Sequence, residues 1–286
     1  MHHDRPTLVL LHGWGMNNGV WDALPAALSE RFHLHPIELP GHGHAPFQPH
    51  WRDLPDWADA VLAQAPEQAI WLGWSLGALV ALQAALQTRS PGRPLGPGQH
   101  TPAQHALARS LATSQTPSQR PPASRIRALI LVAATPRFVQ AADWRAAMPA
   151  ATFDGFHGTL RDDPDTTLER FLALQVRGSQ DARETLRRLR AGLAERPQPH
   201  PEALLAGLDL LREDDLRARL ADLEQPALWL FGERDTLVPA AVAERVALLM
   251  PQAQCRTIAG AAHAPLLSHG NEAADLITAF LDETSP

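Results

Sequence analysis

Several residue types are scarce or missing in this chain of 286 residues. It has no lysine and no tyrosine, and its one cysteine, Cys255, cannot form an internal disulfide, so the fold does not depend on an oxidising compartment. No run reaches the roughly 18 consecutive apolar residues of a membrane-spanning helix. The 25 basic residues, all arginine, are outnumbered by 31 acidic ones, and the net charge of -6 argues against a nucleic-acid binder.

The remaining composition is that of a globular protein. Hydrophobic residues make up 45% of the chain and charged residues 20%, and the length suits one large α/β domain, alone or with a modest insertion. The first residues, "MHHDRPTLVLL", enter an apolar run at once and leave no room for a signal peptide. We therefore expect a cytoplasmic monomer that associates with neither membranes nor nucleic acids.

Short apolar segments alternate with helical patterns along most of the chain. The apolar segments are typical of buried strands and cover 7–15, 33–43, 68–75, 125–136, 226–235 and 253–260. Helical patterns cover 17–31, 51–65, 76–87, 240–250 and 271–283. Strands that are apolar throughout and alternate with helices indicate a mostly parallel sheet with helices on both faces. Such sheets bind ligands beyond the carboxyl ends of their strands.

Two stretches break this alternation. Residues 88–124 are rich in Pro, Gly, Ser, Gln and Thr, and they carry too little apolar surface to offset their ordering entropy, so we expect a disordered surface loop. Residues 137–222, which we call the helical insertion, show helical patterns without a strand. We expect the helical insertion to form a lid over the site, and 1–136 together with 223–286 to form the α/β core.

The pentapeptide Gly73-Trp74-Ser75-Leu76-Gly77 directly follows an expected strand and opens an expected helix. That is the context of the G-x-S-x-G nucleophile elbow, in which a serine occupies a strained turn and glycines remove Cβ atoms that would clash. The alternative is a glycine-flanked serine that merely caps the helix. We favour the nucleophile because suitable partners follow later in the chain.

A serine hydroxyl needs a base, and that base needs an orienting carboxylate. His263 comes just after the last expected strand, and Asp235 comes at the carboxyl end of the strand before it. Each could instead be an ordinary loop residue, the aspartate forming a turn and the histidine capping one. Their positions at strand ends, in the order Ser75, Asp235, His263, match the order expected for α/β hydrolases.

An acyl-transfer enzyme also needs donors for the oxyanion. We expect these to be the backbone N–H groups of Leu76 and of Trp14, the latter in the loop "HGWG". His12 in that loop could be mistaken for a second base, but we favour a bracing role. The histidines of "LPGHGHAP" resemble a metal pair, yet a strand-to-helix loop is the preferred interpretation, and we expect neither a metal nor another cofactor.

Four stretches together carry a more specific resemblance: "LVLLHGWGMNNGVWDALPAALSERFHLHPIELPGHG", "AIWLGWSLGALVA", "ERFLALQ" and "AAHAPLLSH". The sequence resembles the pimeloyl-[acyl-carrier protein] methyl ester esterases of biotin synthesis, within the α/β-hydrolase superfamily. The resemblance implies a serine carboxylesterase with Ser75 as nucleophile, His263 as base and Asp235 as its partner. It also implies substrate contacts at Trp14, Ser75, Leu76, Phe171, Leu172, Ala173, Leu174, Gln175 and His263.

The same resemblance implies an acyl-carrier protein as partner, besides small-molecule esters. Between Arg170 and Arg190 the helical insertion holds six arginines against Asp181 and Glu184, a local charge of +4. An acidic carrier would be attracted to such a patch, and we expect contacts at Arg170, Arg183 and Arg187. The alternative is a solvated helix face without a partner.

The chain also departs from the family pattern. The 88–124 insertion is foreign to it, the usual N-terminal strand pair is largely absent, and Glu38 and Ala45 stand where relatives often carry Asp and Ser. These departures concern the neighbouring loop and the sheet edge, and not the triad. Two other functions also remain open: a generalist esterase or carbon–carbon bond hydrolase on the same scaffold, and a non-catalytic interaction protein of the same fold.

Overall fold

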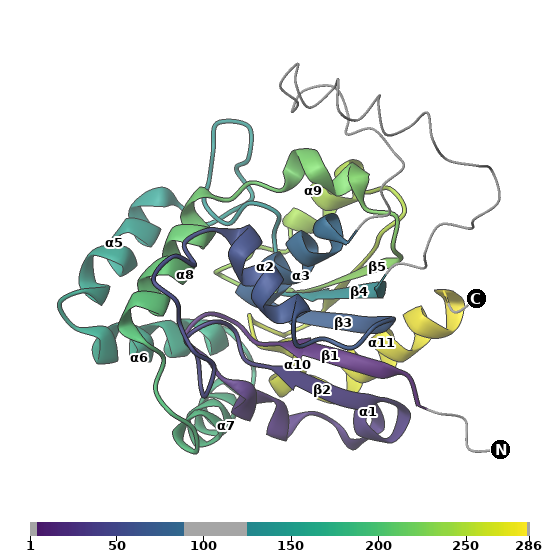
Figure 1. The fold of residues 1–286 in the computed structure, drawn as a ribbon, viewed down its shortest axis with the longest axis horizontal. Coiled ribbons are helices and arrows are strands. Elements are labelled where there is room, and N and C mark those ends of the chain that lie inside the picture. The colour runs from purple at the N-terminus through teal and green to yellow at the C-terminus, as the bar shows by residue number, and fades with distance from the viewer. Residues whose placement is uncertain (1–4, 89–124, 285–286) are drawn as a thin grey trace.

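A computed structural model describes residues 5–88 and 125–284 (Figure 1). The described residues form one six-stranded, fully parallel sheet with the strand order β2-β1-β3-β4-β5-β6. The strands are β1 (Thr7–Leu11), β2 (His33–Ile37), β3 (Ala69–Trp74), β4 (Ile126–Val132), β5 (Ala227–Gly232) and β6 (Gln254–Ile258). All six predicted strands are confirmed, whereas the predicted disordered loop over 88–124 lies outside the described residues apart from Thr88.

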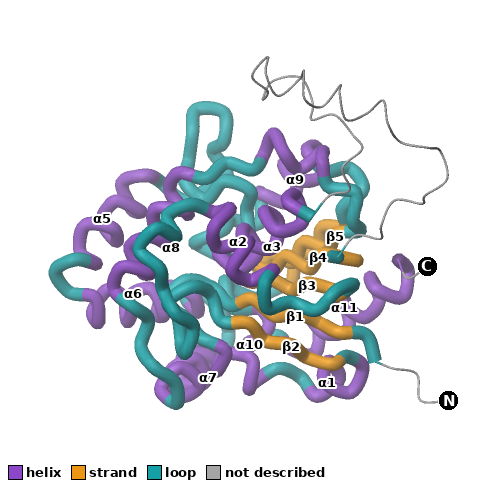
Figure 2. The backbone as a smooth tube through the Cα atoms, viewed as in Figure 1, coloured by secondary structure: helices purple, strands orange, loops and turns teal. Residues whose placement is uncertain are grey.

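Helices cover both faces of the sheet, so its central strands are mostly apolar and buried (Figure 2). Along β1, Val9 and Leu11 belong to one core and Leu8 and Leu10 to the other, because successive side chains of a strand point to opposite faces. The first core is shared with α2 (Leu54–Leu62), α3 (Leu76–Gln87) and α9 (Val242–Leu249). The second is shared with η1 (Asn18–Ala23), α1 (Ala26–Arg31), α10 (Pro265–Ser268) and α11 (Gly270–Thr284).

The edge strands differ from the central ones. Most residues of β2 and β6 are exposed or half-buried, while every residue of β3 and β5 is buried. Strand β2 also contains Pro36, whose missing N–H is tolerated at an edge because that side of the strand lacks a neighbouring strand. No helix in the described ranges is long and apolar enough to cross a membrane.

The helical insertion lies beyond the carboxyl ends of the strands (Figure 1). It contains α5 (Ala150–Leu160), α6 (Pro164–Val176), α7 (Ala182–Ala194), α8 (Pro201–Glu213) and η2 (Arg217–Asp222), and the only extended pairing there consists of two isolated bridges. Thus the predicted run of helices between β4 and β5 is confirmed. It sits where an α/β sheet binds its ligands.

Candidate active site

Ser75 sits between the last residue of β3 and the first of α3 in a backbone conformation that few residues with a side chain adopt (φ 56°, ψ −116°). Its N–H donates to the Val132 carbonyl on β4 (2.9 Å), and its carbonyl accepts the N–H of Ala78 (3.0 Å). Although Ser75 occupies the N-cap position of α3, its hydroxyl makes no capping hydrogen bond. The hydroxyl of this strained turn is therefore not a helix cap, and it is free for another partner.

The two glycines around Ser75 allow backbone segments of neighbouring elements to pack closely against the turn. A Cβ atom on Gly73 would lie 2.5 Å from Ala78 Cα, and one on Gly77 would lie 2.3 Å from the carbonyl oxygen of Leu11 on β1. Neither glycine has a positive φ. The expected clash is thus confirmed, and it involves the backbone of neighbouring elements, which cannot move aside cheaply.

The three residues predicted as a triad lie in one hydrogen-bonded chain. His263 Nε2 is 3.0 Å from Ser75 Oγ, and His263 Nδ1 is 2.7 Å from Asp235 Oδ2. The histidine and aspartate side chains are fully buried. Asp235 Oδ1 also accepts the N–H groups of Leu237 (2.8 Å) and Val238 (2.9 Å). Since a carboxylate only accepts, Nδ1 carries the hydrogen and Nε2 is left to accept the serine proton.

His263 is also held through its main chain. Its carbonyl accepts the indole N–H of Trp74 (2.8 Å), and its N–H donates to the Gln175 carbonyl on α6 (3.0 Å). The second bond joins the loop after β6 to the helical insertion. Sequence reasoning missed both contacts, because main-chain hydrogen bonds between distant segments leave no residue signature.

The predicted oxyanion donors flank Ser75. Leu76 is the first residue of α3, so its N–H has no acceptor one turn earlier, and the helix start favours negative charge. On the other side, a Cβ on Gly13 would lie 3.4 Å from Ser75 Cβ, which places the loop carrying Trp14 against the nucleophile. The start of α3 and the loop that carries Trp14 therefore both lie next to Ser75.

The Trp14 side chain ties this loop to the helical insertion. Its indole N–H donates to the Leu204 carbonyl on α8 (2.8 Å), and its ring meets Phe171 of α6 edge-on, with centroids 4.8 Å apart. Helix α8 comes so close that a Cβ on Gly207 would lie 2.7 Å from Trp14 Cδ1. Ser75 beside this loop is only 5% exposed.

His12 braces the same loop, as expected. Its Nδ1 bonds to the Gly13 carbonyl (2.9 Å), and its Nε2 accepts the N–H of Leu39 after β2 (3.1 Å). A Glu38 carboxylate oxygen lies 3.3 Å from the same Nε2. His12 makes no hydrogen bond to Ser75, so its contacts are those of a support for the loop.

The loop after β2 contains a buried histidine whose position the sequence did not reveal. His42 is 0% exposed, whereas His44 is exposed. Burial, reinforced by the nearby His12 ring, lowers the pKa of His42 to about 3. No group of three or more potential metal ligands exists among the described residues.

The five residues of α6 expected to contact substrate do not share one face. Phe171 and Leu172 are nearly buried and Gln175 is fully buried, whereas Ala173 is exposed and Leu174 half-buried. Phe171 and Gln175, one helical turn apart, are the two that reach the loops of the site. The Gln175 side-chain oxygen and nitrogen are buried and have no hydrogen-bond partner within the described structure.

The three arginines expected to contact a carrier protein are exposed but not equivalent. Arg187 pairs with Glu184, which also accepts from Arg188, and these bonds lower the pKa of the Glu184 carboxyl to about 2. By contrast, Arg170 and Arg183 have no ion-pair partner in the described ranges. The carboxylate of Glu184 therefore offsets much of the charge of Arg187.

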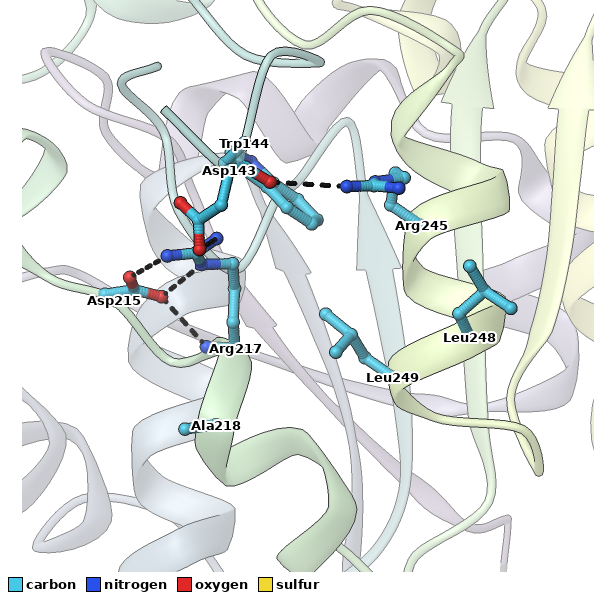
Figure 3. A pocket seen from close by; sticks show the side chains of 8 residues that line it. All are labelled: Asp143, Trp144, Asp215, Arg217, Ala218, Arg245, Leu248 and Leu249. Carbon is cyan, nitrogen blue, oxygen red and sulfur yellow. Dashed lines mark hydrogen bonds and ion pairs between the residues drawn. The ribbon is translucent and has the colours of Figure 1, made fainter. Parts of the chain in front are cut away.

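A separate cavity of about 610 Å³ opens between the helical insertion and α9 (Figure 3). The guanidinium groups of Arg217 and Arg245 lie over the ring of Trp144, at 5.2 and 5.9 Å from its centroid. Arg217 also bridges the carboxylates of Asp143 and Asp215. No predicted site residue lines this cavity, so it does not belong to the site around Ser75.

The fold and the Ser–His–Asp arrangement define the class of protein. The family model described as "Alpha/beta hydrolase family" matches residues 8–276, and the chain belongs to this family. Solved structures agree at the level of the fold. An esterase from Exiguobacterium antarcticum has a TM-score of 0.73 at 17% identity, covering 97% of this chain and 92% of its own. A bromoperoxidase from Bacillus anthracis has a TM-score of 0.74 at 18% identity, covering 97% of this chain and 92% of its own.

Relatives of higher sequence identity indicate a particular group of esterases within this family. The chain is 41% identical to the "Pimeloyl-[acyl-carrier protein] methyl ester esterase" of Stenotrophomonas maltophilia over 98% of this chain and 95% of the relative. It is 39% identical to the protein of that name from Photobacterium profundum, over 96% of this chain and 94% of that relative. The chain therefore belongs to the family of these esterases, and the resemblance found in the sequence is confirmed.

Proposed function

We propose that this protein is a serine carboxylesterase that hydrolyses the methyl ester of pimeloyl-[acyl-carrier protein] in biotin synthesis. The observation that carries the proposal is the hydrogen-bonded chain Ser75–His263–Asp235 in a protein 41% identical to an esterase of that name. In this proposal the enzyme acts as a cytoplasmic monomer without a cofactor, and the helical insertion is the lid of its site.

In the first half of the reaction, Ser75 Oγ attacks the ester carbonyl while His263 Nε2 takes its proton. The imidazolium is stabilised by Asp235, and the tetrahedral oxyanion accepts the N–H groups of Leu76 and Trp14. When the intermediate collapses, its bond to the methoxy oxygen breaks and His263 donates the proton. Methanol leaves, and the pimeloyl group remains bound to Ser75 as an ester.

In the second half, water replaces the alcohol. His263 removes a proton from water, the resulting hydroxide adds to the acyl carbon, and the same two N–H groups hold the oxyanion. Collapse breaks the bond to Ser75 Oγ, which recovers its proton from His263. The products are methanol and a free carboxylate at the end of the pimeloyl chain.

The acyl chain would lie between the loops of the core and the helical insertion. Apolar surface there comes from Phe171, Trp14 and Leu76, which suits the methylene groups of a pimeloyl chain. The unpartnered Gln175 amide lies on the same helix as Phe171 and could bond a polar group of the substrate. Burial of such an amide costs free energy until a partner satisfies it.

The carrier protein would approach the helical insertion. Arg170 and Arg183 supply exposed cations without ion-pair partners in the described structure, and acidic groups on a carrier would be attracted to them. Arg187 stays a predicted contact, although Glu184 offsets its charge. The double reversal Arg170→Glu with Arg183→Glu should lower kcat/KM for carrier-bound substrate about tenfold or more at low salt and leave a short p-nitrophenyl ester unaffected. Arg127→Glu, exposed at the start of β4, is the matched control.

The direct test combines growth with chemistry. Expression of the protein should restore biotin-independent growth to a strain that lacks its methyl esterase, and purified protein should remove the methyl group from pimeloyl-[acyl-carrier protein] methyl ester, as followed by mass spectrometry. Ser75→Ala should do neither and should still fold, as judged by circular dichroism and its melting temperature. Substantial turnover by Ser75→Ala would overturn the triad.

The same assays separate the other two functions. A generalist esterase would hydrolyse short p-nitrophenyl esters well and the carrier-bound ester no better, and a carbon–carbon bond hydrolase would prefer diketone acids. A non-catalytic protein would turn over none of them and would not be labelled at Ser75 by a fluorophosphonate. We expect labelling of the wild type and preference for the carrier-bound methyl ester.

A further inference from the structure

The Trp14 N–H belongs to the peptide group that joins Gly13 to Trp14, and this group and the next one form the turn from Gly13 to Met16. All described peptide bonds are trans, so the C=O and N–H of each group point in opposite directions. The carbonyl of Gly13 accepts from His12 Nδ1 (2.9 Å) and from the N–H of Met16 (3.3 Å), which fixes the group before Trp14. The Trp14 N–H therefore points away from those two donors.

The peptide group after Trp14 is fixed by a different residue. The N–H of Gly15 donates to His42 Nε2, at 3.3 Å. Gly15 has φ +67°, a conformation that residues with a side chain rarely adopt, and a Cβ there would lie 2.6 Å from Leu168 Cδ2. The position therefore favours glycine, which has no side chain that could hold the turn in place. Its N–H bond to His42 is the side-chain contact that holds this second peptide group.

The hydrogen bonds also define the state of the His42 ring. Its Nδ1 lies 2.9 Å from the carbonyl of Pro40, which can only accept, so Nδ1 carries the hydrogen. Its Nε2 faces the N–H of Gly15, which can only donate, so Nε2 is unprotonated. The ring is fully buried, with Trp57 at 5.9 Å and His12 at 5.3 Å between centroids. The His42 ring is thus a rigid hydrogen-bond acceptor, supplied to Gly15 by a loop that is distant from it in sequence.

We propose that His42 is a positioning residue for the oxyanion hole: by accepting the N–H of Gly15 it fixes the peptide group after Trp14, and so holds in place the turn from Gly13 to Met16 that carries the Trp14 N–H. This inference rests on the triad and the oxyanion donors of the proposed function, and not on the identity of the substrate. His42 itself touches neither Ser75 nor the reacting atoms.

Two substitutions separate the two hydrogen bonds of His42. In His42→Gln the amide oxygen can occupy the place of Nε2 and accept from Gly15. In His42→Asn the shorter amide matches Nδ1 and bonds Pro40, but it cannot reach Gly15. With p-nitrophenyl butyrate we expect kcat to fall about tenfold to a hundredfold in His42→Asn at nearly constant KM, and to stay within a fewfold of wild type in His42→Gln. Complete loss of one oxyanion donor would cost roughly a hundred- to a thousandfold.

The affinity for an inhibitor that forms a tetrahedral adduct would not change if the role of His42 were purely structural. An alkylboronic acid binds the serine as such an adduct, so its affinity should fall in His42→Asn by the same factor as kcat/KM. His44→Asn, an exposed histidine of the same loop, is the matched control and should change neither quantity. Full activity and boronate affinity in a folded His42→Asn would overturn the proposal.

The wild type supplies a measurement that does not depend on a variant folding. Nitrogen NMR of the histidine rings should show His42 Nε2 unprotonated near neutral pH, with a coupling across the hydrogen bond to Gly15. A protonated Nε2 or a rapidly exchanging Gly15 amide would contradict the proposal. Absence of any ester hydrolysis by wild type would instead overturn the proposed function, so the two failures are distinguishable.

Discussion

At the scale of single residues, the strained backbone conformation of Ser75 is held in place by its neighbours. A residue with a side chain in the conformation of Ser75 costs about 1–3 kcal/mol, and it persists only where the surroundings hold it. Here the hydrogen bond from Ser75 to Val132 and the tight fit of Gly73 and Gly77 provide that support. In this conformation Oγ makes no capping bond to the helix and lies 3.0 Å from His263 Nε2.

The role of Asp235 can be tested by Asp235→Asn. The asparagine oxygen can still accept from Leu237 and Val238, so the fold should survive, but the amide N–H₂ would face His263 Nδ1. That favours the tautomer with hydrogen on Nε2, which cannot take the serine proton. We expect kcat to fall by roughly three to four orders of magnitude, measured with a p-nitrophenyl ester.

The control for this substitution is Asp162→Asn, in the exposed turn between α5 and α6. It removes the same charge without touching the site and should leave kcat unchanged. A loss of less than tenfold in Asp235→Asn, in protein that melts like wild type, would show that the carboxylate does not orient His263.

At the scale of elements, the sequence predicted the parts that depend on local pattern. The strands and the elbow at Ser75 follow from apolar runs and from glycine spacing, and the strand ends located Asp235 and His263. The sequence did not predict how α6 and α8 pack onto the core. The bonds of Trp14 to Leu204 and of His263 to Gln175 join main-chain carbonyls, which every residue type provides, so no pattern marks them.

Helix α8 offers a test of that packing through Gly207→Ala. Alanine is the better helix former by about 1 kcal/mol, but its Cβ would lie 2.7 Å from Trp14 Cδ1 and 3.2 Å from a Leu76 methyl group. The clash should displace both residues whose N–H groups are the proposed oxyanion donors, and overpacking of this kind costs about 1–3 kcal/mol. We expect kcat/KM to fall about tenfold and the free energy of unfolding in urea to decrease.

A matched substitution in the helical insertion is Gly158→Ala in α5, where nothing lies within 4 Å of the new Cβ. It should stabilise the protein by about 0.5–1 kcal/mol and leave kcat/KM unchanged. If Gly207→Ala behaved like Gly158→Ala, the close approach of α8 to Trp14 would have no functional consequence.

At the scale of the whole molecule, the site is assembled from both parts of the chain. The core supplies the loops after β1, β3, β5 and β6, and the helical insertion supplies α6 and α8 over them (Figure 1). Ser75, at 5% exposure, is covered by this arrangement. The hydrogen bonds of Trp14 to Leu204 and of His263 to Gln175 join the two parts next to Ser75.

The stability of the whole protein should depend on pH through His42. Its pKa is lowered to about 3 in the folded state, whereas an unfolded histidine has a pKa of about 6.5. Below pH 6.5 the unfolded chain binds a proton that the folded state excludes, so stability is lost as pH falls. Between pH 7 and pH 5 this group alone should lower the free energy of unfolding by about 2 kcal/mol.

Urea unfolding of wild type and His42→Gln at both pH values isolates this contribution, because glutamine does not titrate while the rest of the chain is unchanged. The loss of stability between pH 7 and pH 5 should be about 2 kcal/mol smaller in His42→Gln than in wild type. His44→Gln removes an exposed histidine instead and should follow the wild type. Equal pH dependence in wild type and His42→Gln would mean that the buried ring accepts its proton in the folded protein, and Nε2 would then be unable to hold the N–H of Gly15.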